Sequence, residues 1–147
     1  MLLTILLGLV VIGITVVIQG YGTYFWMWKF HNYHQRLTAE QFRKKTVRIL
    51  IATSSFLIFM HLIQSSIWAA LYVVLPGIDE FQNFEKAIYF SLVTFSTLGY
   101  GEITIDSDNR ILAGLEAVNG IILIGWSTAF MFSIFQEMIK RSQIKKN

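Results

Sequence analysis

The sequence has no cysteine, a single proline and few charged residues, and each shortage narrows the class of protein. Without cysteine there are no disulfides, thiolate metal ligands or cysteine nucleophiles. One proline in 147 residues permits long helices, because proline breaks a helix interior. Charged residues make up 14% of the chain, whereas soluble domains contain about 25%. This composition excludes a disordered chain, a collagen-like chain and an ordinary cytosolic enzyme.

Most of the sequence consists of three long runs of residues with almost no charged side chains. Met1–Trp28 and Ile49–Ile78 carry no charged side chain, and Glu116 alone interrupts the run from Ile111 to Gln136. A helix needs about 20 apolar residues to cross the hydrocarbon core of a bilayer. The runs therefore predict an all-α membrane protein with three transmembrane helices, near residues 2–28, 46–75 and 109–138.

A fourth apolar segment is too short to span a bilayer. Ala87–Gly101 contains 15 uncharged residues between Lys86 and Glu102. A helix of this length covers about half of the hydrocarbon thickness, and two glycines follow each other closely at its end. The segment is therefore expected to enter the membrane and return as a re-entrant loop.

The basic residues predict how the chain is oriented. Ten of the twelve lie in 29–48 or 139–147, whereas 76–108 holds six acidic residues and one lysine. Because cytoplasmic loops are rich in Lys and Arg, we expect a multi-pass protein of the plasma or inner membrane, with its N-terminus outside and its C-terminus in the cytoplasm.

The connection 29–45 is expected either to lie on the membrane as an interfacial helix or to run straight into the second span. Arg43, Lys44 and Lys45 in it suit anionic lipid headgroups, although the same charges also serve as ordinary topology signals.

The segment Thr97-Leu98-Gly99-Tyr100-Gly101, between a half-spanning segment and a full span, resembles the selectivity filter of the potassium channels. The residues agree with the physical needs of such a filter. A dehydrated cation needs a ring of oxygens, and backbone carbonyls supply it if an extended chain points them all one way. This geometry needs residues that adopt positive φ, which glycine does at little cost.

The resemblance implies the following organisation. A K+ ion would be coordinated by the backbone carbonyls of Thr97, Leu98, Gly99 and Tyr100 and by the Thr97 hydroxyl, with Gly101 and Glu102 supporting the filter. The pore domain would occupy 46–138, with an outer helix at 46–75, a pore helix at 84–96, the filter at 97–101 and an inner helix at 109–138. An extra transmembrane helix at 1–28 would precede the pore domain, and a basic tail at 139–147 would follow it. Because one chain carries one filter loop, the family resemblance implies a homotetramer in the lipid bilayer.

The predicted inner helix contains a glycine that aligns with the hinge glycine of the family. This residue is Gly120, and close helix packing is an equally good reason for it. By the same resemblance one stripe of the helix lines the cavity and its inner gate. The residues of this stripe are Ile121, Ile124, Thr128, Phe132 and Gln136.

Glu116 is a carboxylate well inside the third predicted span, away from its ends. Such residues are costly in a membrane and are functional candidates for that reason. We expect Glu116 to lie behind the filter, bonded to Ser91, Thr94 or the Tyr100 hydroxyl. The alternative is a hydrated position at the outer interface.

Other classes of membrane protein compete with a potassium channel. A non-selective cation channel of the same fold is disfavoured by Tyr100, and a transporter by the lack of internal repeats. A non-conducting regulatory subunit would use the first helix as a docking surface. The sequence shows no catalytic constellation and no sign of nucleic-acid binding, so an enzyme is not expected.

Overall fold

A computed structural model describes residues 1–35, 39–78, 80–81, 83–106 and 108–143. Side chains are described throughout these ranges except at 34–35, 39–44, 108 and 141–143. The described residues form helices and connecting loops and contain no strand.

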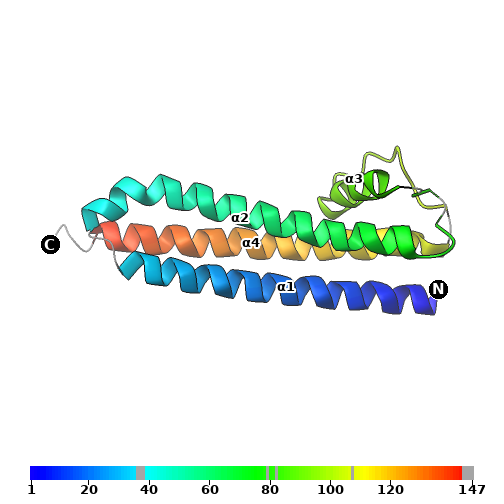
Figure 1. Ribbon diagram of the computed structural model, residues 1–147, viewed down its shortest axis with the longest axis horizontal. Helices are drawn as coiled ribbons and strands as arrows, with labels where there is room; N and C mark the ends of the chain where they lie inside the picture. The colour runs from blue at the N-terminus through cyan, green and yellow to red at the C-terminus, as the bar shows by residue number, and fades with distance from the viewer. Residues whose placement is uncertain (36–38, 79, 82, 107, 144–147) are drawn as a thin grey trace.

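Three long helices lie side by side along the molecule (Figure 1). They are α1 (Leu2–Gln35), α2 (Ala39–Val74) and α4 (Ile111–Gln143). Each contains an apolar stretch long enough to cross a membrane, at Leu2–Tyr33, Lys45–Val74 and Ile111–Lys140. The prediction of an all-α protein with three such helices is confirmed.

A short helix, α3 (Phe84–Phe95), lies beside α2 at one end of the bundle, and the loops around it turn back toward α4 (Figure 1). A single 3-10 turn, η1 (Asp108–Arg110), leads directly into α4. With 12 residues α3 is too short to span, which agrees with the re-entrant segment expected from the sequence.

The helices differ from the expected spans mainly at their ends. α1 continues to Gln35, past the expected end at Trp28, because no proline or helix cap interrupts 29–35 and a helix does not stop where its apolar run stops. α2 begins at Ala39 as one continuous helix, so its first turns run straight into the second span rather than forming a separate interfacial helix. α4 begins at Ile111 rather than 109, after the 3-10 turn.

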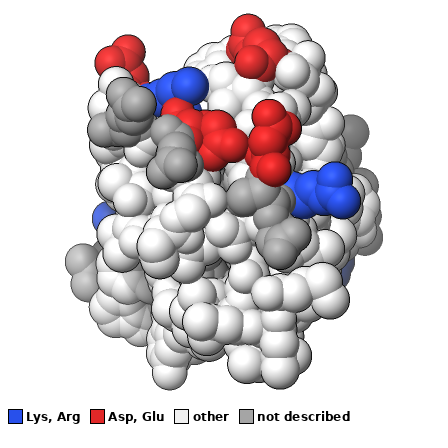
Figure 2. Space-filling view, turned by 90° about the vertical axis from the view of Figure 1, so that its right-hand side faces the viewer, with Lys and Arg blue, Asp and Glu red and all other residues white. Residues whose placement is uncertain are grey.

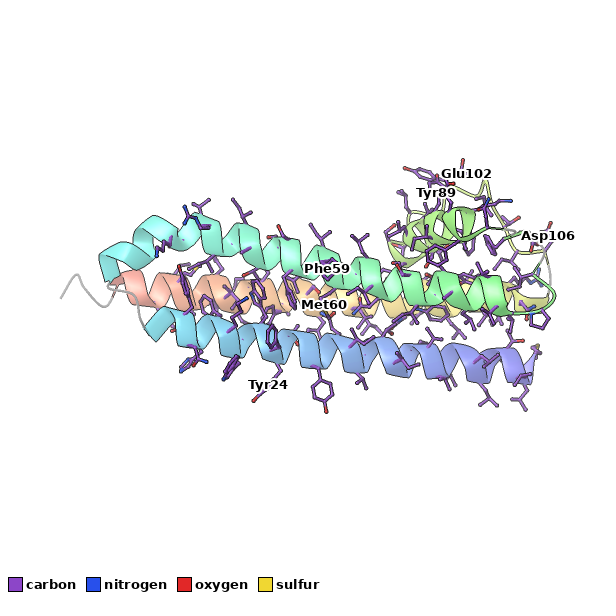
Figure 3. The ribbon with its side chains drawn as sticks, in the orientation of Figure 1. Tyr24, Phe59, Met60, Tyr89, Glu102 and Asp106 are labelled. Atoms are coloured by element: carbon purple, nitrogen blue, oxygen red, sulfur yellow. The ribbon has the colours of Figure 1, made fainter. Side chains whose placement is uncertain are left out.

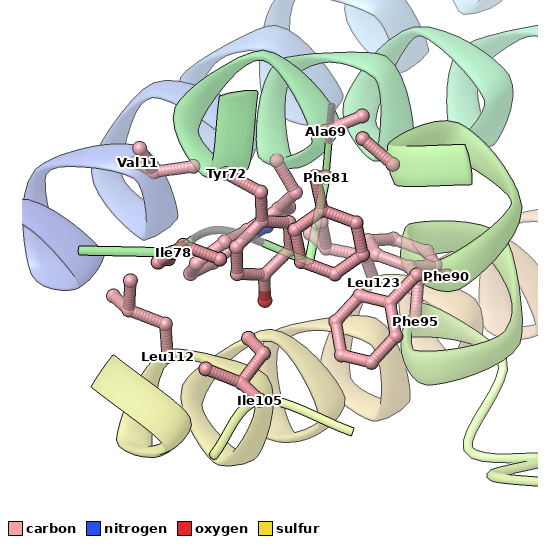
Figure 4. Packing of buried hydrophobic residues seen from close by; sticks show 12 residues of the cluster. Val11, Ala69, Tyr72, Ile78, Phe81, Phe90, Phe95, Ile105, Leu112 and Leu123 are labelled. Carbon is pink, nitrogen blue, oxygen red and sulfur yellow. The ribbon is translucent and has the colours of Figure 1, made fainter. Parts of the chain in front are cut away.

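The interior has two apolar clusters, one toward each end of the bundle. The larger cluster surrounds Tyr72, where residues from all four α-helices and the outer loops meet (Figure 4). The smaller cluster, at the other end, includes Phe30, Leu57 and Ile134. Several fully buried side chains between the two clusters are polar, and many large apolar side chains face outward. This pattern suits a protein surrounded by lipid.

Acidic side chains gather at the end of the bundle that carries α3 (Figure 2). The described acidic residues of α3 and its adjoining loops are Glu80, Glu85, Glu102 and Asp106, and the described basic residues there are Lys86 and Arg110. The described basic residues Lys29, Lys45, Arg48 and Lys140 belong to the parts of α1, α2 and α4 at the opposite end. The charge difference read from the sequence is therefore a difference between the two ends of the bundle.

Candidate functional site

The site is built around α3 and the loop that leaves it. Asn83 caps the helix: its side-chain oxygen accepts a hydrogen bond of 2.9 Å from the backbone N–H of Lys86. Glu85 lies in the first turn, where a negative charge complements the helix dipole. Ser96 is the C-cap, so α3 ends one residue earlier than expected. The segment Thr97–Gly101, called the filter segment below after the role expected from the sequence, begins directly after it.

The backbone of the filter segment has positive φ at every second residue. The φ angles are 60° at Thr97, 55° at Gly99 and 79° at Gly101, whereas Leu98 and Tyr100 keep negative φ. In a regular strand successive carbonyls point to opposite sides. Alternating the sign of φ turns every second peptide and brings the carbonyls toward one side. Thr97 adopts the left-handed region at a cost of about 1–2 kcal/mol, which is a strain typical of functional segments.

Backbone hydrogen bonds hold the start of this segment against α3. The N–H of Thr97 donates to the Thr94 carbonyl at 2.9 Å, and the N–H groups of Leu98 and Gly99 donate to the Val93 carbonyl at 3.0 and 3.3 Å. The strained conformation is therefore determined by the last turn of the helix.

The filter segment is exposed in the single chain. Leu98 is 57% exposed and Tyr100 is 65% exposed, although both are large and apolar. Glu102 follows the segment and accepts a hydrogen bond from the Tyr89 hydroxyl on α3, on the outer side of the helix (Figure 3). The segment is thus tied to α3 at both of its ends, while its apolar side chains have no cover within one chain.

Glu116 lies fully buried behind α3. The Tyr72 hydroxyl on α2 donates to its Oε2 at 2.7 Å, and the Ser91 hydroxyl on α3 contacts its Oε1. Ser91 Oγ also lies 2.7 Å from the backbone carbonyl of Ser65. Its single hydrogen serves one of these two acceptors at a time, so a proton on Glu116 would satisfy both contacts at once.

Tyr72 is held in place by aromatic neighbours (Figure 4). Its ring centroid lies 5.3 Å from that of Phe90 in an edge-to-face arrangement and 5.5 Å from that of Phe81. The expectation named Ser91, Thr94 and Tyr100 as partners of Glu116. Of these the structure brings only Ser91 to the carboxyl group, and the described residues show Tyr72 as its second partner.

Gly120 on α4 is pressed against the end of α3. A Cβ atom added there would lie 1.9 Å from the Phe95 carbonyl oxygen and 2.8 Å from its carbon. Those are backbone atoms, which cannot rotate away. The close approach of α4 to the end of α3 therefore requires glycine at this position. Of the two reasons expected for Gly120, a hinge and close packing, the packing is present within a single chain.

The stripe expected to line a cavity lies on an open face of α4. Ile121, Ile124, Thr128, Phe132 and Gln136 are all exposed in the single chain. The Thr128 hydroxyl donates to the Ile124 carbonyl at 2.9 Å, so it is satisfied within its own helix. The stripe is free to face other copies of the chain or a water-filled space.

The first helix is attached to α4 by buried polar contacts. The Asn119 side-chain amide donates to Thr15 Oγ1 at 2.8 Å, and the Thr15 hydroxyl donates to the Ile12 carbonyl at 2.9 Å. Asn119 is 1% exposed and Thr15 is fully buried. α1 is thus fastened to α4 at the residue next to Gly120.

A second set of polar contacts joins all three long helices one turn or two further on. Gln19 Nε2 donates to Ser127 Oγ at 3.0 Å, and Gln64 Nε2 donates to Gln19 Oε1 at 2.8 Å. His61 Nδ1 lies 2.9 Å from Gln64 Oε1. These contacts and the Thr15–Asn119 pair, together called the polar seam below, were not anticipated from the sequence.

The outer loops are joined by an acidic side chain. The backbone N–H of Asp106 donates to Glu80 Oε1 at 3.0 Å, and this bond lowers the pKa of Glu80 below its usual value of 4.5. The contact ties the loop before α3 to the loop after the filter segment.

The predicted lipid contacts fall partly outside the described residues. The side chains of Arg43 and Lys44 belong to that undescribed part, whereas Lys45 is described and its Nζ lies 5.5 Å from the Tyr33 ring centroid.

Comparison with known proteins places this architecture in a family. A model of the ion-channel family matches residues 47–137, which cover most of α2, all of α3, the segment 97–101 and most of α4. The chain belongs to this ion-channel family, and it is a multi-pass membrane protein. α1 lies outside the matched region.

Two curated relatives are similar over part of the chain. A cyclic nucleotide-gated potassium channel of Rhizobium etli is 33% identical over 70 residues, which are 47% of this chain and 20% of the relative. A calcium-gated potassium channel of Thermoplasma volcanium is 37% identical over 65 residues, which are 43% of this chain and 19% of the relative. The aligned segments thus cover about a fifth of each relative's length. No solved structure matches the chain significantly.

Proposed function

We propose that this protein is a potassium-selective channel that conducts K+ passively through the segment Thr97–Gly101. The observation that carries the proposal is the positive φ at Thr97, Gly99 and Gly101, which is the alternation that a row of carbonyls facing one side would need. Both relatives named above are potassium channels. The backbone carbonyls of Thr97, Leu98, Gly99 and Tyr100, with the Thr97 hydroxyl, would replace the water around a K+ ion.

The channel would be a homotetramer. One chain supplies one row of carbonyls, and a ring around an ion needs several rows. The exposed apolar side chains of the filter segment and of the Ile121–Phe132 stripe support this assembly, because other copies would cover them. Around the shared axis the stripe would line the cavity, with Phe132 and Gln136 near the inner gate.

Each helix then takes a role in the pore. α2 is the outer helix, α3 the pore helix and α4 the inner helix, and α1 packs on the outside of this unit. The C-terminal end of α3 would point the negative end of its helix dipole toward the central cavity, which favours a cation in that cavity. The acidic end of the bundle would face the outside and the basic end the cytoplasm.

The test is the reversal potential of the purified protein in a planar bilayer with K+ on one side and Na+ on the other. A potassium-selective filter shifts this potential far toward the K+ equilibrium value. A clear current that reverses near zero would contradict selectivity and favour a non-selective cation channel. Absence of current over a range of voltage and pH would favour a non-conducting subunit.

A pair of glycine variants checks that the filter segment carries the selectivity. Within one chain, the methyl group of Gly99→Ala meets no atom within 4 Å, but the residue must adopt a φ of 55°, which strains the backbone by about 1–2 kcal/mol. Gly114→Ala, in open space on α4 and without that φ, is the matched control. We expect Gly99→Ala to lose selectivity or current and Gly114→Ala to keep both.

A further inference from the structure

A groove lies between α1 and α2 at the basic end of the bundle. Its volume is about 530 Å³. The described residues that line it include three cations and no carboxylate. They are Trp26, Trp28, Lys29, Phe30, Asn32, Tyr33, Lys45, Arg48, Ile49 and Ala52.

The aromatic wall of the groove is fixed in place. The Trp26 ring stacks on Phe56 with centroids 4.4 Å apart, and its Nε1 donates to Thr53 Oγ1 at 3.0 Å. Lys29 Nζ lies 5.8 Å from the Trp26 ring centroid. The aromatic wall is thus an ordered surface that connects α1 and α2, and the Lys29 ammonium group lies over it.

The position of the groove points to the membrane interface. The apolar stretch of α1 ends at Tyr33 and that of α2 begins at Lys45, so both helices leave the hydrocarbon at this level. Lys and Arg at this depth reach the headgroups, while Trp and Tyr rings lie at the boundary. The groove therefore presents positive charge where lipid phosphates lie, above an apolar floor that contains the buried Phe30 and Ile49.

We propose that this groove binds an anionic phospholipid. Lys29, Lys45 and Arg48 contact the phosphate and the acidic headgroup, and an acyl chain follows the apolar floor toward the bilayer core. A soluble phosphate would satisfy the cations and leave the floor uncovered, so the lipid is the better match. One wall of the site is formed by α1, which lies outside the region shared with the family, and the site does not depend on which ion the pore conducts.

The test measures lipid binding to the full-length protein. Native mass spectrometry follows the protein in detergent during titration with phosphatidylglycerol or with phosphatidylcholine. We expect tighter binding of phosphatidylglycerol, and we expect Arg48→Gln to weaken it about fivefold, since each basic residue near a headgroup contributes on that order. Arg48→Lys keeps the charge and should retain most of the affinity, which separates loss of charge from misfolding.

Lys140→Gln is the matched control, because it removes one exposed charge at the same end of the bundle outside the groove. It should leave the affinity for phosphatidylglycerol unchanged. Equal affinity for the two lipids, or an equal loss from Lys140→Gln and Arg48→Gln, would overturn the proposal. Displacement of the lipid by glycerol 3-phosphate at similar concentration would also overturn it, because the groove would then be a site for soluble anions.

Discussion

Replacing Gly120 with alanine tests how closely α4 must approach the end of α3. The new methyl group would lie 1.9 Å from the Phe95 carbonyl oxygen. An ordinary contact between carbon and oxygen is about 3.3 Å or longer, so the two helices would have to separate by about 1.4 Å. Overpacking of this kind costs about 1–3 kcal/mol and sometimes more.

Gly125→Ala, on the same helix, supplies the reference for this prediction. A methyl group there meets nothing within 4 Å. Both variants gain the same helix propensity, about 1 kcal/mol, so the difference between them isolates the clash. We expect Gly120→Ala to unfold several degrees below Gly125→Ala in thermal scans followed by tryptophan fluorescence.

The same displacement should reach the filter segment. Phe95 is the last residue of α3, and Thr97, two residues later, is hydrogen-bonded to the last turn of the helix. The reversal potential of Gly120→Ala in opposed K+ and Na+ solutions should therefore move toward zero. If Gly120→Ala matched Gly125→Ala in both unfolding temperature and reversal potential, the packing argument would be wrong. A change confined to the open probability would instead indicate a hinge.

Three further predictions concern buried or bridging polar groups. Glu116→Gln keeps the volume but alters the hydrogen bonding behind α3, so we expect a changed rate of inactivation; unchanged conductance, selectivity and inactivation would exclude a role for this carboxyl group. Asn119→Leu removes the amide bonded to Thr15, and leaving that buried hydroxyl with one fewer partner should lower the free energy of unfolding by about 1 kcal/mol, measurable in denaturant titrations. The bond to Asp106, which lowers the pKa of Glu80, stabilises the outer loops above pH 4.5 and is lost as the pH falls through the lowered pKa. Hydrogen exchange at the Asp106 N–H should therefore show an acid transition that is missing in Glu80→Gln.

Local sequence patterns were sufficient to predict the long helices, and Gly99 and Gly101 do adopt the positive φ that the sequence led us to expect. Hydropathy over about 20 residues reports whether a helix can cross a membrane, and each such window is contiguous in the chain. The filter segment is likewise five successive residues, and its two glycines permit the positive φ angles of its backbone. Helix ends were less predictable, because α1 continues beyond its last apolar residue where nothing in the chain stops it.

Of the two partners of Glu116, Ser91 was among those expected from the sequence, but Tyr72 could not be predicted from such patterns. The pairing with Tyr72 depends on how α2 and α4 cross, and these residues are 44 positions apart. A tyrosine near the end of an apolar span is typical of an aromatic belt at the membrane surface, so its sequence context favours a different position. Gly120 raised a similar difficulty, because a glycine in a helix has the same sequence signal whether it hinges or packs. The short distance to Phe95 shows the packing, which the sequence alone could not.

The polar seam binds α1 to α2 and α4, so α1 is an integral part of the helix bundle. Thr15 and Gln19 lie near the middle of the first apolar stretch, where an unbonded amide would face hydrocarbon without any water to bind it. Moving α1 away would expose these groups and also Asn119 on α4. Asn119 is followed by Gly120, which contacts Phe95, the last residue of α3. α1 is therefore connected to the start of the filter segment through a short series of contacts. One wall of the groove between α1 and α2 also belongs to α1, and the polar seam joins that helix to α4 beside Gly120.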